Sequence, residues 1–172
     1  MAIHILLTGN PRTGKTTLIK RIVKNLRHPC GGFYTEEIAR EGKRVGFRIK
    51  TLNGKEGILA MKGLRSRFRL GEYGINIKDL EEIGVKAVME ALENRDFIII
   101  DEIGKMELFS EKFKDIVLKT LDSGKRLIGV IHAADLGFLK AIKARRDVTL
   151  FEVDLCNHEE IIGKITSLIS SS

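Results

Sequence analysis

Apolar residues recur along the chain in two alternating patterns: short runs, and stripes at helical spacing. A short apolar run is typical of a strand buried on both faces of a sheet, whereas helical spacing predicts an amphipathic helix. Strands are predicted on this basis at residues 3–7, 97–100, 127–131 and 148–153. Helices are predicted at residues 18–26, 80–92, 113–121, 138–142 and 161–169. This alternation predicts an α/β fold, a three-layer sandwich with a mostly parallel sheet.

The pattern changes in the second fifth of the chain. Strands are predicted there at residues 33–38, 45–52, 58–61 and 73–77. The second of them alternates apolar and polar residues, which is typical of a strand with one exposed face. Asn53-Gly54 follows it and is the preferred pair for a two-residue type I′ turn. We therefore expect a single domain, residues 1–172, with an antiparallel β-hairpin insertion at about residues 33–76.

Polar residues mark the predicted ends of two helices. Ser110 and Asp135 each stand before a helical stripe, where a side-chain oxygen can cap the free N–H groups. Gly124 is placed to end the helix that Ser110 begins.

A phosphate-binding loop follows the first predicted strand. Residues 9–16 match the pattern G-x-x-x-x-G-K-[ST], whose backbone N–H groups and following helix N-terminus bind phosphates. Lys15 would reach the β- and γ-phosphates, and the Thr16 hydroxyl would bind Mg²⁺. The predicted nucleotide-binding residues of this P-loop are Gly9, Asn10, Pro11, Arg12, Thr13, Gly14, Lys15, Thr16 and Thr17.

Two carboxylates follow the predicted strand at residues 97–100, in a Walker B arrangement. Asp101 would hold Mg²⁺ through its water shell opposite Thr16, and Glu102 would polarise a water at the γ-phosphate. We therefore predict Lys15 and Glu102 as catalytic residues, and Thr16 and Asp101 as the metal site. The nucleotide site is predicted to continue through Asp101, Glu102, Ile103, Gly104, Lys105, Met106 and Glu107. For Lys105 and Glu107, a solvated loop is an equally supported interpretation.

Other polar residues have weaker claims on the site. His132 ends a strand from which it could sense the γ-phosphate, although a hydrogen-bonded or exposed histidine is the simpler interpretation. Arg145 or Arg146 could supply charge in the transition state, or could be surface charge. Glu36 and Glu37 could bind a metal-bound water or a ribose hydroxyl, but carboxylates at a sheet edge are common.

A GTPase switch is not supported. The chain has no glutamine, the residue with which Ras-type GTPases orient water. Residues 101–104 fit D-x-x-G, but no N-K-x-D motif for reading guanine follows.

The net charge of +7 and a pI near 9.5 allow a nucleic-acid partner. The densest basic stretch, residues 62–69, contains only one aromatic residue, so a solvated or nucleotide-facing loop is favoured and a nucleic-acid partner is unsupported. The chain has 31% charged residues, which fits a thermophilic source.

Cys30 and Cys156 are isolated in the sequence, which is not the spacing of a zinc or redox motif. The sequence has no basic-then-apolar leader and no run long enough to span a membrane. We expect a monomeric cytoplasmic protein without membrane contact.

Two segments, residues 32–37 and 100–109, together with the P-loop, resemble the thermophilic nucleoside-triphosphatase family, whose vertebrate members are called cancer-related nucleoside-triphosphatases. The resemblance covers essentially the whole chain. It implies an α/β P-loop NTPase fold and Mg²⁺-dependent hydrolysis of ATP, GTP and other nucleoside triphosphates to diphosphate and phosphate. Because no base-reading element is recognisable in the chain, we expect loose base selectivity, with CTP and UTP also accepted. The chain departs from the family pattern at two positions. It has His132 where the family has proline, and it has His158 beside Asn157 where the family has arginine.

Two other functions compete with hydrolysis. A nucleotide or small-molecule kinase could use the same P-loop, with Glu102 deprotonating an acceptor alcohol and residues 65–69 or Arg145-Arg146 forming a phosphate-clamping lid. Against this, the insertion is predicted as a β-hairpin and not as a helical acceptor-binding module. The other alternative is a nucleotide-dependent binding protein or an RNA-associated protein.

Overall fold

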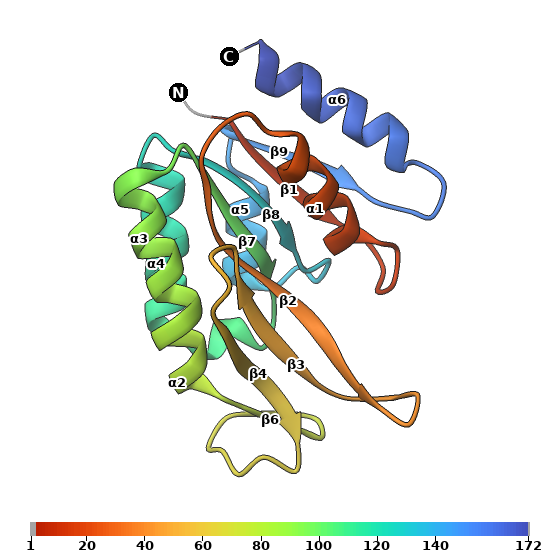
Figure 1. Cartoon of the computed structure of the whole chain (residues 1–172), viewed down its shortest axis with the longest axis vertical. Coiled ribbons are helices and arrows are strands. Elements are labelled where there is room, and N and C mark those ends of the chain that lie inside the picture. Colours follow the sequence, from red (N-terminus) through yellow and green to blue (C-terminus); the bar gives the residue numbers. More distant parts are fainter. Residues whose placement is uncertain (1–2, 172) are drawn as a thin grey trace.

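The computed structural model describes residues 3–171. Its strands are β1 (His4–Thr8), β2 (Cys30–Arg40), β3 (Lys43–Thr51), β4 (Glu56–Lys62), β5 (Arg69–Leu70), β6 (Tyr73–Ile75), β7 (Phe97–Ile103), β8 (Arg126–Ile131) and β9 (Val148–Glu152). Its helices are α1 (Lys15–Asn25), α2 (Ile77–Asp79), the π-helix η1 (Leu80–Val85), α3 (Lys86–Asn94), the 3₁₀-helix η2 (Glu107–Phe109), α4 (Glu111–Asp122), α5 (Gly137–Lys143) and α6 (His158–Ser170). Within the described residues the strands form one mixed sheet in the order β5-β6-β4-β3-β2-β7-β8-β1-β9 (Figure 1).

The parallel part of the sheet consists of β1, β7, β8, β9 and the first residues of β2. Successive apolar residues of β7 point to opposite faces, so Ile98 and Ile99 belong to different core clusters. Helices α1 and α6 pack on the face of Ile99, and α3, α4 and α5 pack on the face of Ile98. The predicted three-layer α/β sandwich is confirmed.

Beyond Phe33 the sheet is antiparallel. The remainder of β2 pairs with β3, and β4, β6 and β5 continue outward. These strands and their connections form an arm, residues 34–75, at the lower end of Figure 1. The predicted antiparallel insertion is confirmed.

The type I′ turn predicted at Asn53-Gly54 is wrong. A type I′ turn needs positive φ at both central residues, and only Gly54 has it, at 92°. The connection from β3 to β4 is longer because Thr51 and Lys55 close it, with the Lys55 N–H donating to Thr51 Oγ1 at 2.9 Å. The two-residue turn with positive φ at both positions joins β2 to β3 instead, at Glu41 (51°) and Gly42 (73°).

The predicted helix ends are partly confirmed. Ser110 caps α4, since its Oγ accepts the Phe113 N–H at 3.1 Å. Asp135 does not cap α5, which begins after Leu136 without a side-chain cap, because its carboxylate lies on the side of Lys143, 3.9 Å from Nζ. None of the described helices is long and apolar enough to cross a membrane.

Candidate functional site

The P-loop joins β1 to α1 at the carboxyl edge of the parallel strands. Glycine is required at two positions of the loop, both because φ is positive there and because neighbouring atoms leave no room for a Cβ. A Cβ on Gly9 would lie 2.5 Å from the Val153 carbonyl oxygen, and one on Gly14 would lie 2.7 Å from the His158 ring. Gly14 also has the left-handed conformation, φ 85°, from which α1 begins. The loop is therefore tightly packed, with the N-terminus of a regular helix directed at its interior.

Lys15 is folded over the P-loop. Its Nζ donates to the carbonyl oxygens of Gly9 at 2.9 Å and Asn10 at 2.6 Å. Burial lowers its pKa, while the charges of Glu102 and Asp101 oppose that shift. The ammonium group is thus held close to both carboxylates that the sequence places in the site.

The structure brings Thr16 and Asp101 together from 85 residues apart, with Thr16 Oγ1 donating to Asp101 Oδ2 at 2.6 Å. The Asp101 side chain is only 1% exposed, and burial raises its pKa to about 7 despite the hydrogen bond from Thr16. Among residues 3–171 no cluster of three or more His, Cys, Asp or Glu is placed to hold a metal. The hydroxyl and carboxylate of this pair are hard oxygen ligands and fit Mg²⁺, provided that phosphate and water supply the remaining ligands.

Two further carboxylates lie close together beside Asp101, because β7 continues to Ile103 and does not end at Ile100 as predicted. A Cβ on Gly104 would contact Glu102 Oε1 and would lie 3.0 Å from Glu107 Oε2. Burial raises the pKa of Glu102, and burial followed by the charge of Glu102 raises the pKa of Glu107 well above its ordinary value. With its side chain 3% exposed, Glu107 is not part of a solvated loop.

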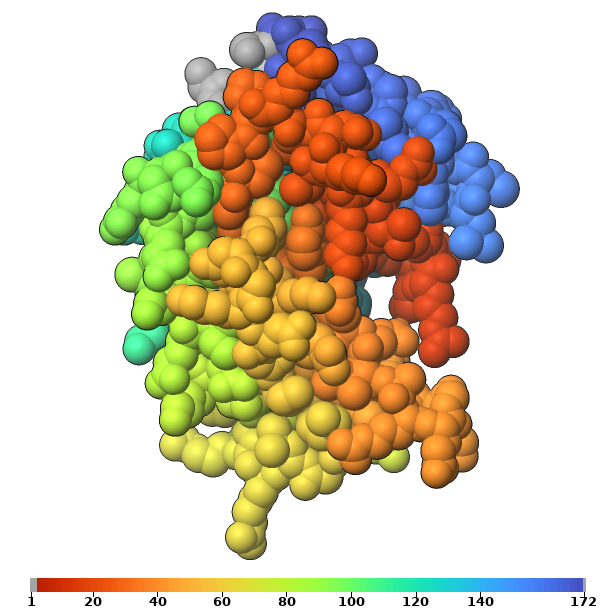
Figure 2. Space-filling model, viewed as in Figure 1, coloured from red at the N-terminus to blue at the C-terminus, as the bar shows by residue number. Residues whose placement is uncertain are grey.

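The neighbours of this pair lie in different environments. Ile103 is fully buried in the core, the partly buried Met106 packs against that core, and Lys105 is exposed. An open notch separates the P-loop, red in Figure 2, from the orange β2–β3 tip of the arm.

Residues 4–166 match the family model described as NTPase. The chain belongs to the NTPase family. It is 49% identical to nucleoside-triphosphatase THEP1 of Thermotoga sp. (strain RQ2), over 97% of this chain and 95% of that protein. It is 35% identical to the human cancer-related nucleoside-triphosphatase, over 100% of this chain and 99% of that protein. The crystal structure of THEP1 from Aquifex aeolicus superimposes with a TM-score of 0.86, at 39% identity, covering 96% and 98% of the two chains.

His132, where the sequence suggested a departure from this NTPase family, faces the site as a neutral ring. Its Nδ1 accepts the Ala134 N–H at 3.0 Å, which places the proton of the neutral imidazole on Nε2. Burial lowers its pKa, and the charges of Lys105, Lys143 and Lys15 lower it further. The ring is therefore both hydrogen-bonded and close enough to Lys15 to be affected by it.

Arg145 is not placed to supply positive charge in the transition state. Its guanidinium binds Asp147 through two hydrogen bonds, of 2.8 and 2.7 Å, and Asp122 through one of 2.9 Å. The carbonyl of Asp147 accepts the N–H of His4 at the start of β1, whereas the P-loop follows the end of that strand. This network, and the exposed Arg146 beside it, lie at the opposite edge of the sheet from the carboxylates.

Arg145→Ala is expected to lower the free energy of unfolding by about 2 kcal/mol, since its charged hydrogen bonds to the largely buried Asp147 and to the exposed Asp122 are lost. Hydrolysis should be unchanged. Arg145 lowers the pKa of Asp147 below the ordinary 3.8, so this pair adds stability above that pH and the stability is lost as pH falls through the lowered value. Denaturant titrations at neutral and acidic pH measure both effects. Arg146→Ala is the control, and an equal loss of stability in it would contradict the prediction.

Glu36 and Glu37 have cationic partners in the structure. Lys20 Nζ donates to Glu36 at 2.6 Å, which lowers the pKa of that carboxyl group, and Arg44 pairs with Glu37 at 3.2 Å. Both carboxylates of the arm are therefore bound to cations, Glu36 to Lys20 and Glu37 to Arg44, and not to the Thr16–Asp101 pair.

Sequence reasoning missed the contact of His158 with the P-loop. From the first turn of α6 its Nε2 lies 2.7 Å from the Thr13 carbonyl oxygen of the P-loop, 145 residues earlier in the chain. The Val153 N–H also donates to Thr8, at 2.8 Å. The segment between β9 and α6 therefore supports the P-loop from one side, and only the deviation at His158 drew attention to it.

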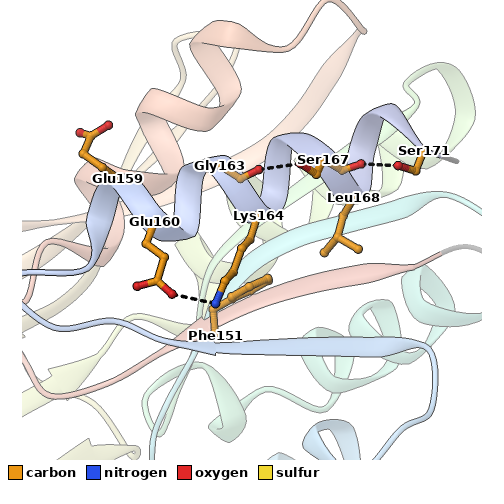
Figure 3. A pocket seen from close by; sticks show the side chains of 8 residues that line it. All are labelled: Phe151, Glu159, Glu160, Gly163, Lys164, Ser167, Leu168 and Ser171. Carbon is orange, nitrogen blue, oxygen red and sulfur yellow. Dashed lines mark hydrogen bonds and ion pairs between the residues drawn. The ribbon is translucent and has the colours of Figure 1, made fainter.

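A groove of about 630 Å³ lies elsewhere, between α6 and β9 (Figure 3). Its charged groups are paired, Lys164 with Glu160 at 2.8 Å and Glu159 with Arg21 of α1 at 2.7 Å. Ser167 and Ser171 donate to backbone carbonyls of α6. Nothing in this lining resembles a phosphate or metal site.

Proposed function

We propose that the protein is a Mg²⁺-dependent nucleoside-triphosphate phosphohydrolase with a single P-loop NTPase domain. The observation that carries the proposal is the contact of the P-loop hydroxyl of Thr16 with Asp101, at 2.6 Å, beside the partly buried Glu102. Membership of the NTPase family supports the same reaction, since the relatives are named nucleoside-triphosphatases.

In this proposal the P-loop binds the phosphates and Lys15 provides the cation. The β- and γ-phosphates accept hydrogen bonds from backbone N–H groups of the P-loop and lie at the N-terminus of α1. Lys15 exchanges its bonds to the Gly9 and Asn10 carbonyls for bonds to phosphate oxygens. Thr16 and Asp101 would hold Mg²⁺, which neutralises phosphate charge when it is bound.

Glu102 then orients a water molecule and accepts its proton. A carboxylate with a raised pKa is a better proton acceptor than an exposed one, and burial raises the pKa of Glu102. Glu107 lies next to Glu102, on the same side of Gly104, with an even stronger tendency to stay protonated. The pair therefore provides one proton acceptor next to one protonated acid, the arrangement that two close carboxyl groups adopt.

A kinase is not favoured. The arm is an antiparallel sheet and carries no helical module for an acceptor, and Arg145 is held at the opposite edge of the sheet. Phosphate release from a panel of nucleoside triphosphates, with and without candidate acceptors, tests the proposal. Transfer to an acceptor without release of inorganic phosphate would contradict it.

We expect ATP, GTP, CTP and UTP to be hydrolysed at rates that differ by less than about tenfold. The residues in this proposal contact phosphates and metal and contain no element that reads a base edge. Initial rates at matched nucleotide concentrations measure this. Discrimination of a thousandfold between two bases would contradict it.

Asp101→Asn is expected to raise the Mg²⁺ concentration that gives half-maximal hydrolysis, because a neutral amide is a weaker ligand for the ion. Burial also favours the protonated form of Asp101, and Mg²⁺ must displace that proton to bind. The Mg²⁺ concentration that gives half-maximal hydrolysis by the wild type should therefore increase as pH falls below about 7. Mg²⁺ titrations at pH values on both sides of 7 measure both effects. The control is Asp115→Asn, an exposed residue of α4. An unchanged Mg²⁺ requirement in Asp101→Asn would exclude Asp101 from the metal site.

A further inference from the structure

A second pocket, of about 350 Å³, lies between the loop that follows β4 and the start of α2. Its cations are Arg65, Arg67 and Lys78, and the ring of Phe68 and the side chain of Ile77 add apolar surface. This loop, yellow in Figure 1, belongs to the arm at the end of the molecule away from α6. The nucleotide site proposed above uses none of these residues.

The three cations of this pocket are exposed and lack acidic partners. Within residues 3–171, no ion pair joins Arg65, Arg67 or Lys78 to a carboxylate, whereas nearby Lys62 pairs with Glu72 at 3.2 Å. The next arginine, Arg69, is used internally, since it donates to the carbonyls of Leu64 and Glu72. Three free cations around one pocket favour an anionic ligand.

The loop holds its shape through its own hydrogen bonds. Ser66 Oγ donates to the Ile75 carbonyl at 2.7 Å and accepts the Phe68 N–H at 3.1 Å. The Ile75 N–H in turn donates to the Phe68 carbonyl at 2.9 Å. Phe68 packs against Phe109 with ring centroids 5.7 Å apart, and the Arg67 guanidinium lies 5.7 Å from the Phe68 ring centroid. The pocket is therefore largely formed before a ligand binds, which reduces the entropic cost of binding.

An aromatic and apolar wall beside free cations fits a ligand that combines a flat apolar ring with a phosphate. We propose that this pocket binds a nucleotide unit of a single-stranded nucleic acid, with the base against Phe68 and the phosphate among Arg65, Arg67 and Lys78. A free nucleotide has the same chemistry, but the charge of the arm favours a strand. Residues 34–75 contain ten Lys and Arg against five Glu, a net charge of +5 out of the +7 of the whole chain. This positive surface extends well beyond one phosphate.

Other anionic partners fit less well. A membrane surface would require large apolar side chains on the arm, but the exposed large apolar residues of the described chain all lie elsewhere. An acidic peptide would use the cations but not the aromatic wall.

Fluorescence anisotropy of a labelled oligoadenylate tests the proposal. The double variant Arg65→Glu/Arg67→Glu should weaken binding at least about tenfold and flatten the salt dependence, because two phosphate contacts are lost. Phe68→Leu keeps an apolar side chain but removes the ring, and should weaken binding about fivefold or more. The matched control, Lys119→Glu/Lys140→Glu, makes the same change of charge on exposed residues of α4 and α5 and should bind as the wild type does. Circular dichroism confirms that each variant is folded.

Three results would overturn the proposal. An equal loss in the control variant would mean that net charge alone determines binding. Equal binding of polyglutamate, or displacement of the strand by an equal concentration of AMP, would exclude a strand-specific site. Binding should persist in Lys15→Ala, and its loss there would assign the strand to the P-loop. Because anisotropy does not depend on hydrolysis, a protein that fails to hydrolyse nucleotides can still pass this test.

Discussion

Lys15→Ala should reduce phosphate release from ATP below detection and weaken triphosphate binding. The Lys15 ammonium is the cation that the P-loop motif specifies, and it already lies within hydrogen-bonding distance of two loop carbonyls. In the variant, the charge that develops on the transferred phosphoryl group loses this partner in a site where burial strengthens electrostatic interactions. Phosphate release and the binding of a fluorescent ATP analogue measure the two effects separately.

Lys24→Ala is the matched control for this result. Lys24 is an exposed residue of the same helix, α1, and lies in its last turn, away from the P-loop. It should hydrolyse ATP at the wild-type rate. A wild-type rate in Lys15→Ala would mean that the P-loop is not the active site.

The parts of the fold that were predicted correctly depend on local patterns. Ile98, Ile99 and Ile100 form a run that is buried on both faces of the sheet, and the stripe from Phe113 to Leu121 marks the buried side of α4. Thr16 and Asp101 meet across 85 residues, and this too was predicted, because each belongs to a motif whose partner motif is known. A pattern read locally can therefore predict a distant contact when both ends are specified.

The features that were missed depend on contacts without a local signal. His158 supports the P-loop from α6, and the connection of Asn53 and Gly54 is set by the closure between Thr51 and Lys55. Whether Glu107 is solvated or buried depends on how η2 packs beside β7, which periodicity does not encode. Arg145 could be assigned to the opposite edge of the sheet only once its partners Asp147 and Asp122 were placed. In each case the outcome depended on tertiary packing that the local sequence does not specify.

Glu102→Gln should reduce the rate of hydrolysis by about a hundredfold or more, the usual scale for general-base catalysis, while triphosphate binding survives. Glutamine keeps the shape and hydrogen-bonding capacity of Glu102 but cannot accept a proton from water. The variant should therefore retain unhydrolysed ATP, detectable as bound nucleotide after rapid filtration. As the pH is lowered, the wild-type rate should begin to fall at a higher pH than it would with an exposed glutamate as the base. The reason is that burial raises the Glu102 pKa and the protonated form is inactive.

Glu93→Gln, at an exposed position of α3, is the matched control and should leave both rate and binding unchanged. Glu107→Gln separates the roles of the two neighbouring carboxyl groups. Because Glu107 favours its protonated form, an amide resembles its resting state, and the loss of rate should be smaller than in Glu102→Gln. If Glu102→Gln hydrolyses ATP normally while a substitution at Glu107 or His132 does not, another residue is the base. The fold and the phosphate-binding role of the P-loop would then stand, and the proton would leave the attacking water toward the neighbouring Glu107 or toward His132 at the end of β8.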